Sequence, residues 1–275
     1  MRIGRIPYIN CYPVYGAIDR GIVGLDATLV DGVPTELNRR MSHGELDISV
    51  VSAVEYARDS ARYLLLPDLA ISCDGPVRSV MLFSRRPAPE LGRRRVVVSR
   101  SSMTSVALLE LLFEHVWRVQ PQFVAGDAEL SDVVGEGATD VDARLVIGDA
   151  ALLLGSRERQ RYPCAYDLGA MWKDWTGQPF VFAVWVAQRT ADVKDALVAH
   201  AALIASRNWG LEHLSELAAQ AAEATGVEER VCRNYLSGLD YGLSYPHLAG
   251  LTEFYRRLVE RGRIPNGTLT FLPAA

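Results

Sequence analysis

The sequence predicts an α/β protein with two lobes, each a mostly parallel sheet flanked by helices, and a ligand cleft between the lobes. Segments with strand character alternate with segments of helix character, which implies parallel sheets covered by helices. This alternation runs through the chain twice, with a shift of about 95 residues between the two units. A chain of 275 residues is also long enough for roughly two domains of about 100–200 residues each.

The first unit begins with a short strand, Arg2–Ile6, which ends at Pro7 because proline has no N–H to donate. A helix is expected after Asn10, over Cys11–Ile18, with Pro13 in its first turn. Asn10 therefore lies between a strand and a helix, where ligands bind in open α/β folds. The unit continues with a strand, a helix, a strand and the start of a helix, at Ala27–Val30, Pro34–His43, Asp47–Val50 and from Ser52.

The second unit repeats this order. Its first strand, Arg95–Val98, leads through a serine-rich turn into a helix over Met103–Trp117. A strand, a helix, a strand and a further helix are then expected at Phe123–Val124, Glu129–Val134, Arg144–Ile147 and from Asp149. In both units the last strand runs into a small or acidic residue that caps a helix.

Two crossings connect the lobes. Three apolar runs, Arg62–Leu66, Leu69–Ser72 and Ser79–Ser84, precede a proline-rich linker over Arg85–Pro89. A turn and strand over Thr176–Trp185 carry the chain back. Four helices, at Ala191–Arg207, Leu211–Thr225, Glu228–Leu236 and His247–Arg261, then complete the first lobe. We expect a discontinuous first lobe, 1–86 plus 186–275, and a second lobe over 87–185, joined by a hinge.

Composition excludes several classes of protein. The net charge of −4 and the pI near 5.8 argue against a nucleic-acid surface. The N-terminus has no apolar run of the length of a signal peptide, and no stretch approaches the roughly 18 apolar residues of a membrane span. The four cysteines are far apart, with no CxxC and no histidine at metal-ligand spacing. We expect a cytoplasmic, reduced and metal-free protein with no membrane partner, whose oligomeric state, including a homodimer, stays open.

The cleft should be lined by the helix starts that the repeat brings together. The most informative is Ser99–Ser105, whose Ser102, Thr104 and Ser105 open an apolar helix with more hydroxyls than capping needs. Asn10 and Ser52 are candidates of the same kind, although Asn10 can also be read as a helix cap. Because a buried carboxylate would disfavour an anionic ligand, the Asp149 cap is interpreted mainly as structural.

A second informative stretch is Asp74–Ser79, in which Gly75 and Pro76 form a turn before a strand. In a regular strand Arg78 and Ser79 point to opposite faces, so only one of them enters the cleft. The sequence does not choose between them. The aromatic side chains of Trp172, Trp175, Phe180 and Phe182 either line the cleft or pack the hinge.

Familiar catalytic motifs are missing from the sequence. It contains no GxSxG, P-loop, HExxH or GxGxxG motif. The five histidines fall within or beside predicted helices, away from the cleft motifs, and are interpreted as surface or packing residues.

At these motifs the chain resembles the chorismate dehydratases of the futalosine route to menaquinone, which have a two-lobed fold like that of type II periplasmic binding proteins. The matching stretches keep family order and span nearly all of the chain: RIGRIPYINCYP, GELDISVVSAVEY, CDGPVRSVMLFS, SSMTSVALLELL, LVIGDAALL, YDLGAMWKDWTGQPFVFAVW and YLSGLDYGLSYPHLAGLTEFY.

The resemblance implies that water is removed from chorismate to give 3-[(1-carboxyvinyl)oxy]benzoate, without a cofactor. The family's catalytic asparagine falls on Asn10 and its serine after GPV on Ser79. The expected substrate-binding set is Ser52, Gly75, Pro76, Ser102, Thr104, Ser105, Gly148, Asp149 and Phe180.

Two alternatives stay open. One is a binding module for small carboxylates without turnover, although no export signal or DNA-binding segment is recognised. The other is the sister enzyme 1,4-dihydroxy-6-naphthoate synthase, for which we would expect a histidine in the cleft.

Overall fold

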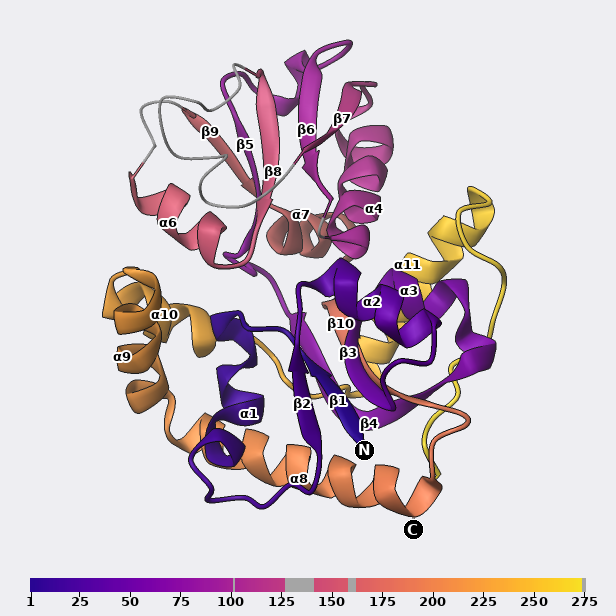
Figure 1. Ribbon diagram of the computed structural model, residues 1–275. Coiled ribbons are helices and arrows are strands. Elements are labelled where there is room, and N and C mark those ends of the chain that lie inside the picture. The colour runs from indigo at the N-terminus through magenta and orange to yellow at the C-terminus, as the bar shows by residue number, and fades with distance from the viewer. Residues whose placement is uncertain (101, 127–140, 158–161, 274–275) are drawn as a thin grey trace.

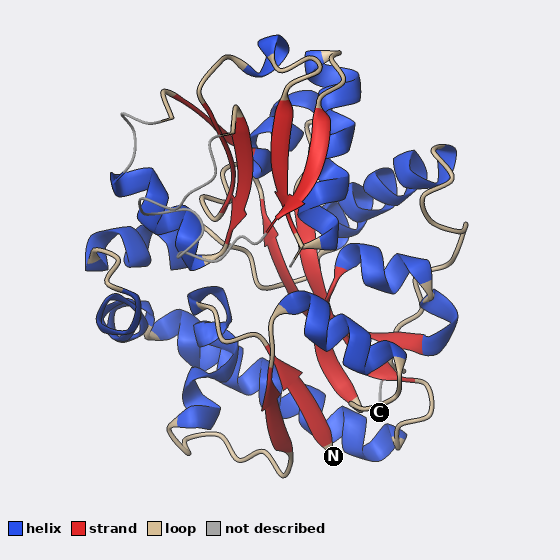
Figure 2. Cartoon of the chain, turned by 45° about the horizontal axis from the view of Figure 1, so that its top comes forward, coloured by secondary structure: helices blue, strands red, loops and turns tan. Residues whose placement is uncertain are grey.

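The protein has two lobes, each built on a five-stranded sheet flanked by helices (Figure 1). The structure is a computed structural model and describes residues 1–100, 102–126, 141–157 and 162–273. Seen from a second direction, the two sheets lie one above the other with helices on their faces (Figure 2). The predicted α/β fold with two lobes is confirmed.

Sheet A belongs to the lobe that holds both ends of the described chain. Its strand order is β2-β1-β3-β10-β4. Its strands are β1 (Arg2–Arg5), β2 (Thr28–Asp31), β3 (Ile48–Ser52), β4 (Tyr63–Cys73) and β10 (Phe180–Gln188). Strand β1 is parallel to β2 and β3, whereas β10 is antiparallel to both of its neighbours. Four of the five described strands therefore run in one direction.

Sheet B has the same plan, in the order β7-β6-β8-β5-β9. Its strands are β5 (Val80–Ser84), β6 (Arg95–Ser99), β7 (Gln122–Gly126), β8 (Ala143–Ile147) and β9 (Cys164–Asp167). Strand β6 is parallel to β7 and β8, and β5 is antiparallel to β8 and β9. The repeat that the sequence predicts is thus visible as an equivalent strand order in the two sheets.

The antiparallel strand of each sheet is the one that follows a crossing between the lobes. Strand β5 enters sheet B directly after β4 of sheet A, and β10 returns to sheet A after β9. We expected Val80–Ser84 in the first lobe and residues 180–185 in the second, and this assignment of both strands is wrong. Each of these two strands enters its sheet from the other lobe, and each runs antiparallel to the strands beside it. The lobe boundaries themselves stay a prediction.

The helices cover the faces of the sheets and begin close to the expected positions. In the sheet-A lobe they are α1 (Tyr12–Asp19), α2 (Pro34–Ser42), α3 (Ala53–Arg58), α8 (Val193–Glu212), α9 (Leu214–Thr225), α10 (Glu229–Leu236) and α11 (Tyr245–Glu260). In the sheet-B lobe they are α4 (Met103–Leu112), α6 (Asp149–Arg157) and α7 (Leu168–Thr176). Short turns of 3-10 helix lie at Ile9–Cys11, Ser60–Arg62 and Ala88–Glu90, and a π-helical turn at Phe113–Trp117 follows α4.

Two details differ from the expectation, and a further one is not tested. The two runs Arg62–Leu66 and Leu69–Ser72 form one strand, β4, because left-handed Asp68 and a register shift against β10 absorb the interruption at Pro67. Strand β9 and helix α7 were not predicted from the pattern of the sequence. The helix expected at Glu129–Val134, like Ser101, lies outside the described residues.

The hydrophobic core fills the space between each sheet and its helices. Among its fully buried side chains are Trp172, Trp185, Tyr15 and Phe254. None of the helices in the described ranges combines the length and the apolar character that a membrane span needs. The carboxyl ends of β1 and β3, and of β6 and β8, lead into the residues of one cavity between the lobes.

Candidate functional site

A cavity of about 70 Å³ lies between the two lobes and takes its lining from both. Its lining residues are Ile6, Tyr8, Asn10, Pro34, Ser52, Ile71, Val77, Ser79, Val80, Ser102, Ser105, Ile147, Gly148, Phe182 and Ala183. Six residues of the predicted site are among them, namely Asn10, Ser52, Ser79, Ser102, Ser105 and Gly148. The chain therefore brings most of the predicted polar set into one space.

Asn10 lies in the 3-10 turn Ile9–Cys11 that joins β1 to α1. It does not cap α1, because Cys11 occupies the cap position and makes no side-chain cap bond. The Oδ1 atom of Asn10 is buried and accepts no hydrogen bond from the described residues. A buried amide oxygen without a donor is costly, so this atom is available for a donor that a ligand brings.

Ser79 is presented by an irregular turn between β4 and β5. Gly75 and Arg78 both have positive φ, 120° and 63°, and Asp167 accepts hydrogen bonds from the N–H groups of Val77 and Arg78 at 3.0 and 2.6 Å. This geometry buries Ser79, whereas Arg78 is exposed and lies against Gly238. Ser79 is thus the residue of the pair that lines the cavity.

Gly75 and Pro76 shape this turn and do not line the cavity. Gly75 is buried and its φ of 120° is one that L-residues rarely adopt, while Pro76 is exposed. Val77 occupies the place in the lining that we expected Gly75 and Pro76 to take.

The Ser52 hydroxyl lies at the carboxyl end of β3, directly before α3. Its Oγ accepts a hydrogen bond from Asn38 Nδ2 at 2.8 Å, and its N–H donates to Asn38 Oδ1 at 3.2 Å. Asn38 is buried beside Leu37 and Met41 on the inner face of α2. It was not predicted, although a polar residue within that apolar stripe is a signal that the sequence contains.

The hydroxyl residues at the start of α4 have two different roles. Ser102 caps the helix by accepting the Ser105 N–H at 3.3 Å, and its own hydroxyl donates to Ser105 Oγ at 2.7 Å. Both serines line the cavity. Thr104 does not; it is buried, and its Oγ1 accepts the Val54 N–H of α3 at 3.2 Å. Thr104 therefore joins the two lobes.

Gly148 lines the cavity, and Asp149 follows it as the first residue of α6. Gly148 has a φ of 63° and lies against the ring of Tyr8. Asp149 does not line the cavity, and its Oδ1 accepts the Ile9 N–H at 3.3 Å across the lobe interface. Burial raises the pKa of Asp149 to about 6, an effect that the hydrogen bond from Ile9 partly opposes.

Phe182, and not Phe180, lines the cavity. Phe180 is buried in the core between Trp172 and Phe254, with ring centroids 5.2 and 4.9 Å away. The register of β10 against β4 shifts between Val181 and Ala183, which interrupts the alternation of faces at Phe182.

The cavity combines hydroxyl and amide groups with the starts of several helices. Pro34, Ser52, Ser102 and Gly148 lie at or directly before the first residues of α2, α3, α4 and α6. Helix starts carry partial positive charge and favour anions. None of the described lining residues carries a formal charge. The site is therefore suited to a small anion with an apolar body, held against Ile6, Val77 and Phe182.

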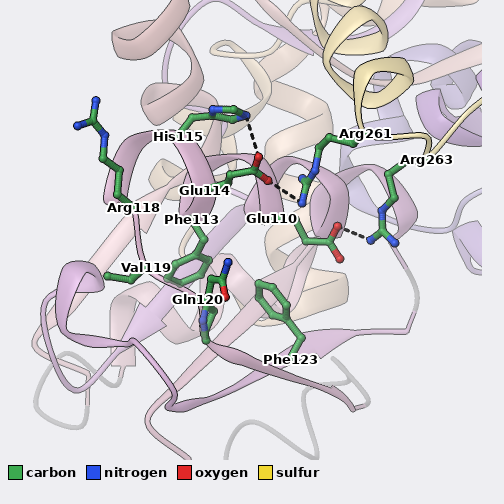
Figure 3. Close-up of a pocket in the computed structure, with 11 residues that line it drawn as sticks. Glu110, Phe113, Glu114, His115, Arg118, Val119, Gln120, Phe123, Arg261 and Arg263 are labelled. Carbon is green, nitrogen blue, oxygen red and sulfur yellow. Dashed lines mark hydrogen bonds and ion pairs between the residues drawn. The ribbon is translucent and has the colours of Figure 1, made fainter.

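A larger groove of about 800 Å³ lies elsewhere, between the end of α4 and the residues after α11 (Figure 3). There Glu114 pairs with Arg261 at 2.8 Å, and Glu110 pairs with Arg263. Because its glutamates already neutralise two of its arginines, and because no predicted site residue lines it, the groove is a weaker candidate. His115, which also lines the groove, stacks on Trp175 with ring centroids 5.2 Å apart.

Comparison with known proteins is consistent with this geometry. A family model described as menaquinone biosynthesis matches residues 1–260. The chain is 35% identical over 243 residues to the chorismate dehydratase of Thermus thermophilus, which covers 84% of this chain and 86% of that protein. It is 28% identical over 187 residues to the chorismate dehydratase of Campylobacter jejuni, which covers 66% of each.

Two solved structures show the same fold. Protein AF1704 from Archaeoglobus fulgidus has a TM-score of 0.76 at 19% identity and covers 96% of this chain and 98% of its own. The periplasmic aliphatic sulphonate binding protein SsuA from Escherichia coli has a TM-score of 0.65 at 13% identity and covers 98% and 89%. The expected likeness to periplasmic binding proteins is confirmed at the level of the fold.

Proposed function

The chain belongs to the menaquinone biosynthesis family, and we propose that it is a chorismate dehydratase, a carbon–oxygen lyase that converts chorismate to 3-[(1-carboxyvinyl)oxy]benzoate. Two relatives that carry this name support the proposal. The observation that carries it is the position of Asn10 and Ser79 in one uncharged cavity, among serines and helix starts.

The chemistry of chorismate suits a site without charged catalysts. The hydrogen on the carbon that bears the ether is vinylogously acidic, because the diene carboxylate delocalises the charge left behind. Loss of this proton and of the neighbouring hydroxide makes an aromatic ring, so the driving force lies in the substrate. The protein then has to hold one conformer and stabilise developing charge, and we propose that no cofactor is needed.

Each polar group has a role in this proposal. Ser102 and Ser105 at the start of α4 bind one carboxylate, aided by the helix dipole. Ser79 bonds to a substrate oxygen, and Asn10, with its unpartnered Oδ1, orients the reacting centre. An amide is not a general base, so the proton passes to the enolpyruvyl carboxylate of the substrate itself.

The lobes have to separate before the substrate can bind. The cavity, of about 70 Å³, is small for a ring that carries two carboxylates. Thr104 with Val54, and Asp149 with Ile9, are contacts that have to break or shift on opening. We propose that the structure represents the closed arrangement.

The sister enzyme is disfavoured because none of the five histidines, all in the described ranges, lines the cavity. Four free cysteines support a reducing compartment such as the cytoplasm. The direct test is incubation with chorismate followed by ultraviolet and mass spectra. We expect a benzoate spectrum and a product lighter by one water. Binding of chorismate without any mass change would instead support a binding protein without turnover.

A further inference from the structure

Two serines of the cavity each accept a hydrogen bond from a buried side chain that does not itself line the cavity. The hydroxyl of Tyr235, on α10, donates to Ser79 Oγ at 2.8 Å. The Nδ2 atom of Asn38, on α2, donates to Ser52 Oγ at 2.8 Å. Tyr235 and Asn38 thus belong to two helices that lie far apart in the sequence.

The direction of the bond from Asn38 follows from a second contact. The Ser52 N–H can only donate, and its partner is Asn38 Oδ1 at 3.2 Å. The oxygen of the amide is therefore committed to the backbone, and its NH₂ group faces Ser52 Oγ. Since Oγ accepts this bond, the proton of the Ser52 hydroxyl is left to point to another acceptor.

The same reasoning applies to Tyr235. Its side chain is 1% exposed, and burial raises the pKa of its hydroxyl well above the usual value, so the phenol stays neutral. A phenol is more acidic than an aliphatic alcohol and is the better donor of the two. The Ser79 hydroxyl thus accepts from Tyr235, and its own proton is free to point into the cavity.

We infer that Tyr235 and Asn38 are positioning residues that make the Ser79 and Ser52 hydroxyls hydrogen-bond donors toward the substrate. This inference rests on the proposed function and adds the reason why an uncharged site can take a dianion. A hydroxyl that accepts a hydrogen bond becomes a stronger donor itself. Because its O–H direction is also fixed, it does not have to reorient when negative charge develops on the substrate. A substrate oxygen that accepts a hydrogen bond is therefore favoured at these two positions, and a group that can only donate, such as an ammonium, is not.

The first test compares Tyr235→Phe, Ser79→Ala and the double variant in chorismate turnover. Removing the tyrosine hydroxyl alone should lower kcat by about 10–100-fold and change KM by less than about threefold. If Tyr235 acts through Ser79, the double variant is no slower than Ser79→Ala. Losses that multiply in the double variant would overturn the inference.

A matched control is Tyr241→Phe. Tyr241 is also buried, at 3% exposure, but its hydroxyl has no hydrogen-bond partner within the described ranges. This variant should turn over chorismate at the wild-type rate. If Tyr241→Phe and Tyr235→Phe lose activity equally, the loss at Tyr235 is an effect of core packing and the inference fails.

The second test is Asn38→Asp. An ionised carboxylate still accepts the Ser52 N–H, but it accepts from the Ser52 hydroxyl as well and turns its proton away from the cavity. We expect kcat to fall by at least about tenfold near pH 8 and to recover as the pH is lowered and the carboxyl is protonated. The exposed Asn266→Asp variant adds the same charge and should show neither effect.

The outcomes separate the two proposals. A wild-type protein that does not convert chorismate contradicts the proposed function. An active wild type with Tyr235→Phe and Asn38→Asp variants as fast as itself at every pH contradicts this inference alone.

Discussion

The backbone N–H of Val54 donates to the side-chain oxygen of Thr104 at 3.2 Å, and this bond joins the start of α3 to the start of α4 across the two lobes. Thr104 is 1% exposed, so the bond is shielded from water. The residue that we expected to bind substrate is therefore part of the contact between the two lobes.

Thr104→Val keeps the shape of the side chain and removes the acceptor. The buried Val54 N–H then loses its partner, which should lower the free energy of unfolding by about 1–3 kcal/mol. Urea unfolding measures this loss, and chorismate kinetics should show a raised KM because the closed arrangement is less populated. Thr104→Ser, which retains the oxygen, is the control. A valine variant with wild-type stability and KM would exclude this role.

Asp149 should make stability depend on pH. Its pKa is raised from 3.8 to about 6 by burial, so the folded protein binds this proton more tightly than the unfolded chain does. The contribution of Asp149 is favourable below about pH 4 and is lost as the pH rises through about 6. Asp149→Asn keeps an oxygen for the Ile9 N–H and removes the titration.

We expect the Asn variant to gain stability relative to wild type as the pH rises from 4 to 7, measured as the urea midpoint at each pH. Asp174→Asn, at an exposed position of α7, controls for the loss of one carboxylate. A difference between Asp149→Asn and wild type that stays constant over this range would contradict the assigned effect of burial.

Gly148 tests the packing between the lobes. Its φ of 63° disfavours any L-residue, and an added Cβ would lie 3.2 Å from the ring of Tyr8. Gly148→Ala should destabilise the fold by about 1–2 kcal/mol and also raise KM, because both residues line the cavity.

The matched control is Gly177→Ala, at a φ of 72° with nothing within 4 Å of the added atom. It should cost similar stability and leave KM unchanged. Equal KM values for the two variants would show that the contact with Tyr8 does not matter for binding.

Local pattern was enough to predict the strands that carry the repeat. The predicted strands Arg2–Ile6 and Arg95–Val98 are observed as β1 and β6. Short alternating or apolar runs that are bounded by proline or serine turns are typical of strands. The same pattern predicted that Asn10, Ser52, Ser102 and Ser105 meet, since each follows the carboxyl end of a parallel strand.

The rest depended on contacts that no local pattern contains. The sequence could not choose between Arg78 and Ser79, because the turn is irregular and is held by Asp167 from a distant strand. We expected Phe180 in the lining, but Phe182 is found there. The sequence could not show this, because the bulge at Phe182 depends on the pairing of β10 with β4. Tyr235 and Ser79 are 156 positions apart in the sequence, so only the folded structure shows that their hydroxyls form a hydrogen bond.

The most direct test of the central claim is the turnover of chorismate by wild type, Asn10→Ala and Asn10→Asp, followed by mass spectrometry. Asn10 contributes a buried, unpartnered amide oxygen to the cavity, which Asn10→Ala removes, whereas Asn10→Asp keeps an oxygen but adds a negative charge beside a dianionic substrate. Both variants should therefore lose at least about 100-fold in kcat. The wild type should release a product lighter by one water. Near-wild-type turnover by Asn10→Ala, or an unchanged mass with the wild type, would contradict the account.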